Sequence, residues 1–304
     1  MKKKCLIVMG GMSIGGAQKS LINFLNYIKD FVEIDLLLWN KSVMEYNIPD
    51  GINIITNFPT VKSVKAAIKI DGLFSKTFLL SVFAAIFYKK RWLCSPEIKK
   101  KYDFAIAYTT TGSIKYFVID KVNANKKFLW YHHGSYEQVG KIKMWDKEYF
   151  PKFDNLITVS NANKEMLSTH FPKLEKKILV IQNLLNEKEI IYLSKEPISD
   201  FDDFDGLKLT TVGRFSEEKG QLFAIEIAKE LRDKDIIFKW IFVGDGDLRT
   251  QVEQKIVEYN LSDFCILAGN KKNPYPYIKN CDIYIQPSFV ESYSLTIYEA
   301  MILK

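Results

Sequence analysis

The sequence of 304 residues has little cysteine, and its hydrophobic runs are short. Four cysteines exclude a disulfide-stabilised scaffold, and because none of them forms a C-x-x-C pair, we expect buried free thiols in a reducing compartment. The apolar stretch at residues 77–88 has about a dozen residues, whereas a membrane-spanning helix needs roughly 20. The N-terminal apolar run at residues 5–9 is too short for a signal peptide and favours a first buried strand.

Arginine is also scarce, since only four of the 43 basic residues are arginine and the formal net charge is +7. Nucleic-acid recognition usually relies on arginine forks and aromatic platforms, so we expect no nucleic-acid partner. The excess of lysine fits either genome base composition or a basic face that meets anionic lipid or nucleotide. A hydrophobic content of 47% excludes a disordered chain.

Strand, turn and helix patterns alternate along the chain. Residues 4–9 form a continuous apolar run, which is typical of a buried parallel strand, and residues 17–28 have helical spacing. The alternation restarts at residue 207, after the acidic segment SDFDDFDG. We therefore predict an α/β fold of two doubly wound Rossmann-like domains: residues 1–190, a linker at 191–206, and an incomplete second domain at 207–304. The ligand site is expected in the cleft between them, at the carboxyl ends of the strands.

A glycine-rich turn, GGMSIGGA, lies between the first strand and its helix and contains Gly15 and Gly16. Free backbone N–H groups at a helix start can bind an anion. However, the spacing fits neither the P-loop nor the dinucleotide fingerprint, which disfavours a nucleotide-cofactor oxidoreductase. A simple tight turn is the alternative interpretation.

Two further segments contain charges after a strand. Arg214 and Lys219 in GRFSEEKG could neutralise a diphosphate, although a solvated turn paired with a neighbouring glutamate also fits. Glu291 precedes a predicted helix that contains Glu299, and two such carboxylates could accept hydrogen bonds from sugar hydroxyls. A capped surface helix with two solvated glutamates is the alternative.

His132 and His133, in WYHHG, end an apolar strand and account for two of the three histidines. A histidine there can bind a ligand or act as a base, whereas a packed histidine pair is the structural alternative. A zinc site is not expected, since neither a cysteine nor a third histidine lies near in sequence.

Together these motifs resemble the retaining GT-B glycosyltransferases of family 4, glycosyltransferase group 1, which includes bacterial capsule, teichoic-acid and lipopolysaccharide enzymes. The resemblance rests on Gly15-Gly16-Ala17, WYHHG, VSNANKEML, IQNLLN, VGRFSEEKG, VGDGDLR and the E-x7-E spacing of Glu291 and Glu299, in this order over nearly the whole chain. Gln182-Asn183-Leu184 departs from the usual Pro-Asn-Gly. The chain also ends soon after Glu299, so we expect a C-terminally truncated form whose activity is impaired.

The resemblance implies a transferase that takes a nucleotide sugar as donor, needs no cofactor or metal, and retains the anomeric configuration. It implies that the diphosphate is held by Arg214 and Lys219 and the ribose by Glu299. Glu291 and His133, or less favourably His132, would lie near the donor sugar as catalytic residues. The remaining implied donor-binding residues are Gly15, Gly16, Leu295 and Thr296.

The implied acceptor is a cell-surface glycan or a lipid-linked molecule, handled by a cytoplasmic enzyme. In residues 61–92, lysines are interleaved with apolar residues. This pattern fits peripheral association with the anionic inner face of a membrane, or a core helix with a solvated lysine side. A non-catalytic GT-B-fold binding or scaffold protein, or an inactive fragment, is the rival hypothesis.

Overall fold

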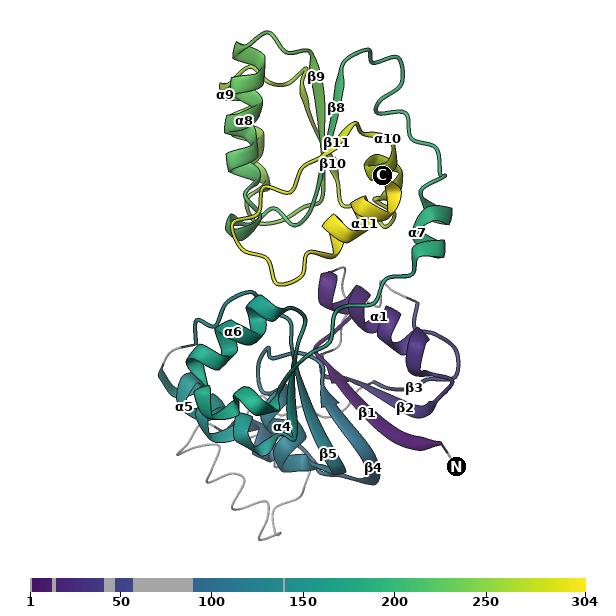
Figure 1. Ribbon diagram of the computed structural model, residues 1–304, viewed down its shortest axis with the longest axis vertical. Helices are drawn as coiled ribbons and strands as arrows, with labels where there is room; N and C mark the ends of the chain where they lie inside the picture. The colour runs from purple at the N-terminus through teal and green to yellow at the C-terminus, as the bar shows by residue number, and fades with distance from the viewer. Residues whose placement is uncertain (1, 13–14, 41–46, 57–89, 139) are drawn as a thin grey trace. The chain divides into compact units, whose positions relative to one another are not determined.

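The computed structural model describes residues 2–12, 15–40, 47–56, 90–138 and 140–304, and the chain divides into two compact units (Figure 1). The first unit is Met1–Leu184 and the second is Leu185–Lys304. The domain boundary expected at residue 190 falls inside helix α7 (Glu187–Leu193), which belongs to the second unit. Phe201, from the segment expected to be a linker, is buried in the core of this second unit.

The first unit contains a parallel sheet of seven strands in the order β3-β2-β1-β4-β5-β6-β7. Its apolar runs are buried on both faces, as a parallel sheet requires; strand β1, for example, is buried from Cys5 to Met9. In Figure 1, α1 lies on one side of the sheet and α4, α5 and α6 on the other. The element bounds are β1 Lys3–Met9, α1 Gly16–Ile28, β2 Val32–Leu38, β3 Asn53–Ile55, η1 Arg91–Cys94, β4 Ile98–Ala107, α4 Ile114–Lys121, β5 Val122–Tyr131, α5 Gly140–Tyr149, η2 Phe150–Lys152, β6 Asn155–Thr158, α6 Asn161–His170, η3 Pro172–Lys177 and β7 Ile178–Val180.

The second unit contains a parallel sheet of four strands in the order β10-β9-β8-β11. Two separate hydrophobic clusters cover its two faces: one packs α8 and α9 against the sheet, and the other packs α7, α10 and α11 against it. This double covering buries residues 209–212 of β8 and residues 240–243 of β9. The bounds are β8 Leu207–Val212, η4 Glu217–Lys219, α8 Gln221–Asp233, β9 Phe238–Val243, α9 Arg249–Glu258, β10 Cys265–Gly269, α10 Tyr275–Asn280, β11 Ile283–Tyr284 and α11 Leu295–Leu303.

The predicted α/β fold with two doubly wound units is confirmed, and so is the expectation of buried free thiols. All four cysteines are buried and free, and burial raises the pKa of Cys5 and of Cys265 to about 12. Ser160 caps helix α6 by accepting a hydrogen bond from the Asn163 backbone N–H at 3.2 Å. The apolar stretch at 77–88 and most of the basic segment 61–92 lie outside the described residues.

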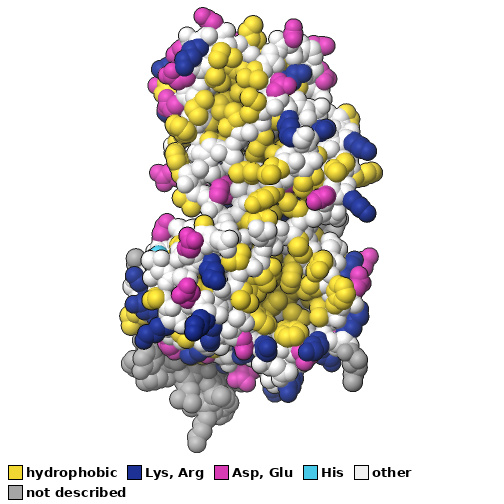
Figure 2. Space-filling view, viewed as in Figure 1, with side chains coloured by type: hydrophobic (Ala, Val, Ile, Leu, Met, Phe, Trp, Pro, Cys, Tyr) yellow, Lys and Arg dark blue, Asp and Glu magenta, His cyan; other side chains and the backbone are white. Residues whose placement is uncertain are grey.

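No helix among the described residues is long and apolar enough to cross a membrane. On the face seen in Figure 2, lysine and arginine side chains are interspersed with acidic ones over both units and do not form a single basic patch. This face therefore gives no support to a dedicated basic surface.

Candidate functional site

The second unit brings two loops together at one edge of its sheet. Strands β8 and β11 are parallel neighbours, so the loop that follows β8 and the loop that follows β11 leave the same sheet edge side by side. The first loop contains Arg214 and Lys219, and the second contains Glu291 before α11 begins. Two segments about 70 residues apart in the sequence therefore form one surface.

Backbone contacts lock these two loops to each other. The Glu218 carbonyl accepts hydrogen bonds from the backbone N–H groups of Phe289, at 2.9 Å, and Val290, at 3.4 Å. Gly220 has φ of 70°, and a Cβ added to it would lie 2.2 Å from the Pro287 carbonyl oxygen. Only glycine fits both this left-handed conformation and this close approach, so the turn before α8 is specified by packing as well as by backbone geometry.

Lys219 and Glu291 form the central contact of this site. The Lys219 ammonium lies 2.7 Å from Glu291 Oε1, and the two side chains are 24% and 23% exposed. The pair is thus partly screened from water yet open to a ligand. An ammonium has three N–H donors, so Lys219 can hold Glu291 and still donate to another anion.

A polar network surrounds the same carboxylate. Ser288 Oγ lies 2.8 Å and Gln286 Nε2 lies 3.3 Å from Glu291 Oε1, and Gln286 Nε2 also donates to Ser288 Oγ at 2.7 Å. On its other side, Gln286 Oε1 accepts from Tyr284 at 2.5 Å and from Thr296 at 3.0 Å. Thr296, expected to bind the donor, therefore directs its hydroxyl to Gln286.

The second carboxylate of the E-x7-E spacing lies in the interior. Glu299 is only 1% exposed and sits one helical turn after Leu295, the first residue of α11, which is also buried. Burial raises the pKa of the Tyr284 hydroxyl, and the negative charges of Glu299 and Glu291 raise it further. Glu299 is therefore an interior group and not the solvated surface glutamate of the alternative interpretation.

Arg214 is exposed, and its guanidinium has no hydrogen bond or ion pair with any described residue. Its backbone is fixed, because the buried Gln221 donates to the Arg214 carbonyl at 2.8 Å. A Cβ on Gly246 would lie 3.0 Å from Arg214 Cγ, so that glycine leaves room for the arginine stem. Arg214 is thus an available cation on the same loop as Lys219 and is not paired with Glu217 or Glu218.

The remaining predicted site residues belong to the first unit. Gly15 precedes α1 with extended backbone, φ of 175°, and Gly16 is the first residue of that helix. A Cβ added to Gly15 would lie 2.7 Å from the Gln18 Oε1 atom, the end of a flexible side chain. The structure thus confirms a glycine turn at a helix start, and its proposed closeness to phosphate stays a prediction.

The two histidines after β5 have different environments. His132 stacks near-parallel on Trp130 at 6.1 Å and lies 4.9 Å from the Tyr108 ring, with Nε2 shielded from solvent. This burial lowers the pKa of His132 to about 3, so the imidazole is neutral at pH 7. His133 is exposed, and its carbonyl accepts a hydrogen bond at 3.0 Å from the buried Asn163. His132 therefore fits the packed alternative, and His133 remains the accessible one.

Sequence reasoning gave no role to Gln286, Ser288 or Tyr284. The available signal was the segment YIQPS, where polar side chains directly follow a short strand. Their importance comes from contacts with Glu291 and Thr296, which a linear pattern does not reveal. Among the described residues, no group of three or more His, Cys, Asp and Glu side chains is arranged to hold a metal ion.

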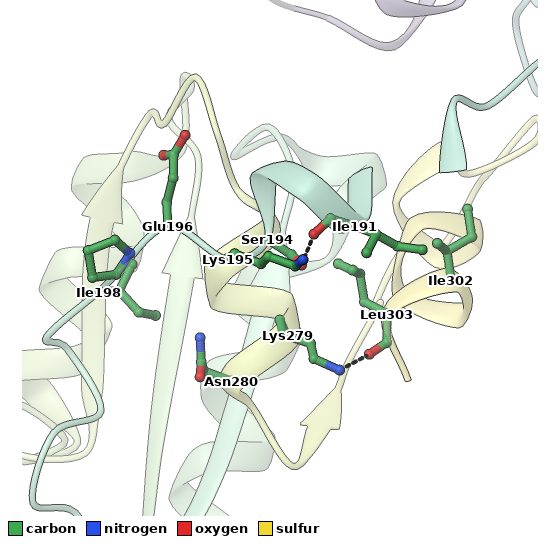
Figure 3. Close-up of a pocket in the computed structure, with 10 residues that line it drawn as sticks. Ile191, Ser194, Lys195, Glu196, Ile198, Lys279, Asn280, Ile302 and Leu303 are labelled. Atoms are coloured by element: carbon green, nitrogen blue, oxygen red, sulfur yellow. Dashed lines mark hydrogen bonds between the residues drawn. The ribbon is translucent and has the colours of Figure 1, made fainter. Parts of the chain in front are cut away.

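A cavity of about 630 Å³ lies elsewhere in the second unit, where α7, α10 and α11 meet (Figure 3). In Figure 3, Lys279 reaches the Leu303 carbonyl, with a hydrogen bond of 3.0 Å. The lining is mixed apolar and charged, and it includes none of the predicted site residues. The Lys219–Glu291 surface is the better candidate because it contains convergent charged and polar groups.

Comparison with known proteins supports the same region. Residues 202–304 match the family model of Glycosyl transferases group 1. An uncharacterized glycosyltransferase of Methanocaldococcus jannaschii is 30% identical over 193 residues, which cover 60% of this chain and 48% of that protein. An N-acetylgalactosamine-N,N'-diacetylbacillosaminyl-diphospho-undecaprenol 4-alpha-N-acetylgalactosaminyltransferase of Campylobacter jejuni is 27% identical over 152 residues, covering 50% and 40% respectively. The chain thus spans about half the length of these relatives.

A structural comparison agrees on the fold. The structure of Anabaena HepE in complex with UDP and glucose matches with a TM-score of 0.67 and 18% identity, covering 99% of this chain and 78% of that one. At this identity the likeness shows the fold alone. The chain therefore has a GT-B-like α/β fold, and its residues 202–304 match a glycosyl transferases group 1 domain.

Proposed function

We propose that this protein is a retaining glycosyltransferase of family 4 that transfers a sugar from a nucleotide-sugar donor to a cell-surface glycan or lipid-linked acceptor. The observation that carries the proposal is the contact between Lys219 and Glu291 at the carboxyl edge of β8 and β11. The same loop carries Arg214, whose guanidinium has no partner among the described residues. The match of residues 202–304 to Glycosyl transferases group 1 supports it.

The charges of the second unit suit a nucleoside diphosphate leaving group. When the bond between the sugar and the diphosphate breaks, negative charge grows on the phosphate oxygens. Arg214 can offer its planar fork to these oxygens, and Lys219 can offer the N–H donors that Glu291 does not use. Two fixed cations can supply this stabilisation without a metal ion or cofactor.

The two carboxylates suit the hydroxyl groups of the donor. Glu291 is partly exposed and lies next to Lys219, so it can accept a hydrogen bond from the transferred sugar. Glu299 is buried in the middle of α11, and we place the ribose against it. His133 is the proposed contact to the sugar from the first unit, with Gly15 and Gly16 close to the phosphates. Leu295 and Thr296 complete the donor site.

The acceptor class is proposed from the relatives. The Campylobacter jejuni protein bears diphospho-undecaprenol in its name, so a lipid-linked acceptor at the inner face of the cell membrane fits this chain. A cytoplasmic enzyme would meet such an acceptor by peripheral association.

A panel of UDP-, GDP- and ADP-sugars tests the proposal. A ligand that binds the folded state raises the unfolding midpoint, so we expect one nucleotide class to stabilise the protein and Arg214→Ala to abolish that shift. Stabilisation followed by sugar release to water or acceptor supports a transferase. Stabilisation without any turnover would instead favour a non-catalytic binding protein of the same fold.

A further inference from the structure

The hydrogen bonds around Gln286 define where each proton points. Ser288 has a single hydroxyl proton, and it donates that proton to Glu291 Oε1 at 2.8 Å, because an ionised carboxylate can only accept. Ser288 Oγ must then accept at its 2.7 Å contact with Gln286. The amide nitrogen of Gln286 therefore faces Ser288 and Glu291, and its oxygen faces the other way.

The opposite end of the same amide is held equally firmly. Gln286 Oε1 accepts from the hydroxyls of Tyr284, at 2.5 Å, and Thr296, at 3.0 Å. Reversing the amide would place its oxygen against the carboxylate of Glu291, where two acceptors would repel. The Gln286 side chain thus has one orientation, fixed from β11 on one side and from α11 on the other.

The two carboxylate oxygens of Glu291 have different hydrogen-bonding environments. Oε1 receives hydrogen bonds from three donors, namely Lys219, Ser288 and Gln286. Oε2 has no hydrogen bond or ion pair with any residue that the structure describes, and the side chain is 23% exposed. One carboxylate oxygen is therefore saturated by the protein, while the other is left open to accept from a ligand.

We infer that Gln286 is a positioning residue that holds Glu291 with Oε2 presented to a hydroxyl of the donor sugar. The inference rests on the proposed function and adds a residue to its site. Gln286 itself does not touch the donor; it acts through Glu291. It therefore serves recognition of the sugar, whereas Arg214 and Lys219 serve the diphosphate.

The test compares Gln286→Met, which keeps the length of the side chain but removes both ends of the amide, with Gln254→Met on the exposed surface of α9. Titration calorimetry measures the affinity for UDP and for UDP-glucose, or for the nucleotide and sugar nucleotide of the class that stabilises the wild type. We expect Gln286→Met to weaken sugar-nucleotide binding about tenfold and nucleotide binding less than about twofold. Gln254→Met should change neither.

A double-mutant cycle separates positioning from simple structural support. When Glu291→Ala is already present, adding Gln286→Met should lower the sugar-nucleotide affinity only a little further. The reason is that Gln286 acts by positioning Glu291. Equal losses for nucleotide and sugar nucleotide, or additive losses in the cycle, would overturn the inference while leaving the proposed function intact. A wild-type protein that binds no member of the nucleotide-sugar panel would contradict both together.

Discussion

The first strand of each unit is followed by a glycine-containing turn and a helix, yet the two turns are held in different ways. In the first unit, α1 contributes Ser20 and Asn23, which bond the Asn183 side chain at 2.6 Å and the Leu184 carbonyl at 2.7 Å. In the second unit, the turn before α8 is locked to the loop of residues 287–291 by Gly220 and by the Lys219–Glu291 pair.

The two turns differ in how tightly their backbone geometry is restricted. In the first unit the helix is tied to a later segment of the chain, and the glycine turn itself has room, because an added Cβ at Gly15 meets only a flexible side chain. In the second unit the turn itself carries charge, and a backbone oxygen 2.2 Å from an added Cβ leaves no room. Substitutions around Gly220 and Glu291 should therefore cost more than a substitution at Gly15.

Replacing Glu291 should have the largest effect. Glu291→Ala removes the acceptor of Lys219, Ser288 and Gln286 and the oxygen proposed to face the sugar, so sugar transfer or donor hydrolysis should fall by roughly 100-fold. Steady-state kinetics measures this, with Glu258→Ala on the exposed end of α9 as the matched control. Unchanged turnover in Glu291→Ala would show that Glu291 has no part in the reaction.

Gly220→Ala should destabilise the second unit. The variant must place a Cβ against the Pro287 carbonyl and hold a non-glycine residue at φ of 70°, so unfolding free energy should fall by at least about 2 kcal/mol. Gly112→Ala is the matched control, since it shares a positive φ of 62° but has open space, and should lose only about 1 kcal/mol. Urea unfolding of both variants gives the comparison; equal losses would mean that the Pro287 contact is unimportant.

His132 should make the first unit sensitive to acid. Its pKa is lowered from 6.5 to about 3 in the folded protein, so below pH 6.5 the unfolded chain binds a proton that the folded chain does not. Stability is therefore lost as the pH falls from about 6.5 towards 3.

His132→Phe keeps a ring against Trp130 and Tyr108 but cannot titrate. Between pH 7 and pH 5 it should lose roughly 1–2 kcal/mol less stability than the wild type does. Denaturant unfolding at the two pH values measures this difference. Identical pH dependence in both proteins would show that His132 is protonated in the folded state as easily as in the unfolded one.

Gly15→Ala should have the smallest effect on stability. Its backbone is extended, with φ of 175°, and the Gln18 side chain can move away from an added methyl group. We expect a change below about 1 kcal/mol in urea unfolding. A loss as large as that of Gly220→Ala would show that the two turns are equally constrained and would remove the contrast between the units.

Much of the fold could be predicted from the sequence, because apolar runs buried on both faces alternate with helical spacing. This pattern identified both doubly wound units. The chain also contained a visible pair of cations, Arg214 and Lys219, and the E-x7-E spacing. The contacts within each motif could not be predicted, because the sequence does not reveal that the Thr296 hydroxyl is directed to Gln286. The expected role of Thr296 in donor binding stays a prediction.

Local sequence alone determined which segments become strands and helices and which loops carry charge, because those properties depend on neighbours a few residues away. Tertiary structure brings Lys219 to Glu291 and leaves Arg214 without a partner among the described residues. It also buries Glu299 and places Gln286 against the Glu291 carboxylate. The physical reason is the parallel pairing of β8 with β11: it brings together side chains some 70 residues apart, and hydrogen bonds over such a separation leave no periodic trace in the sequence.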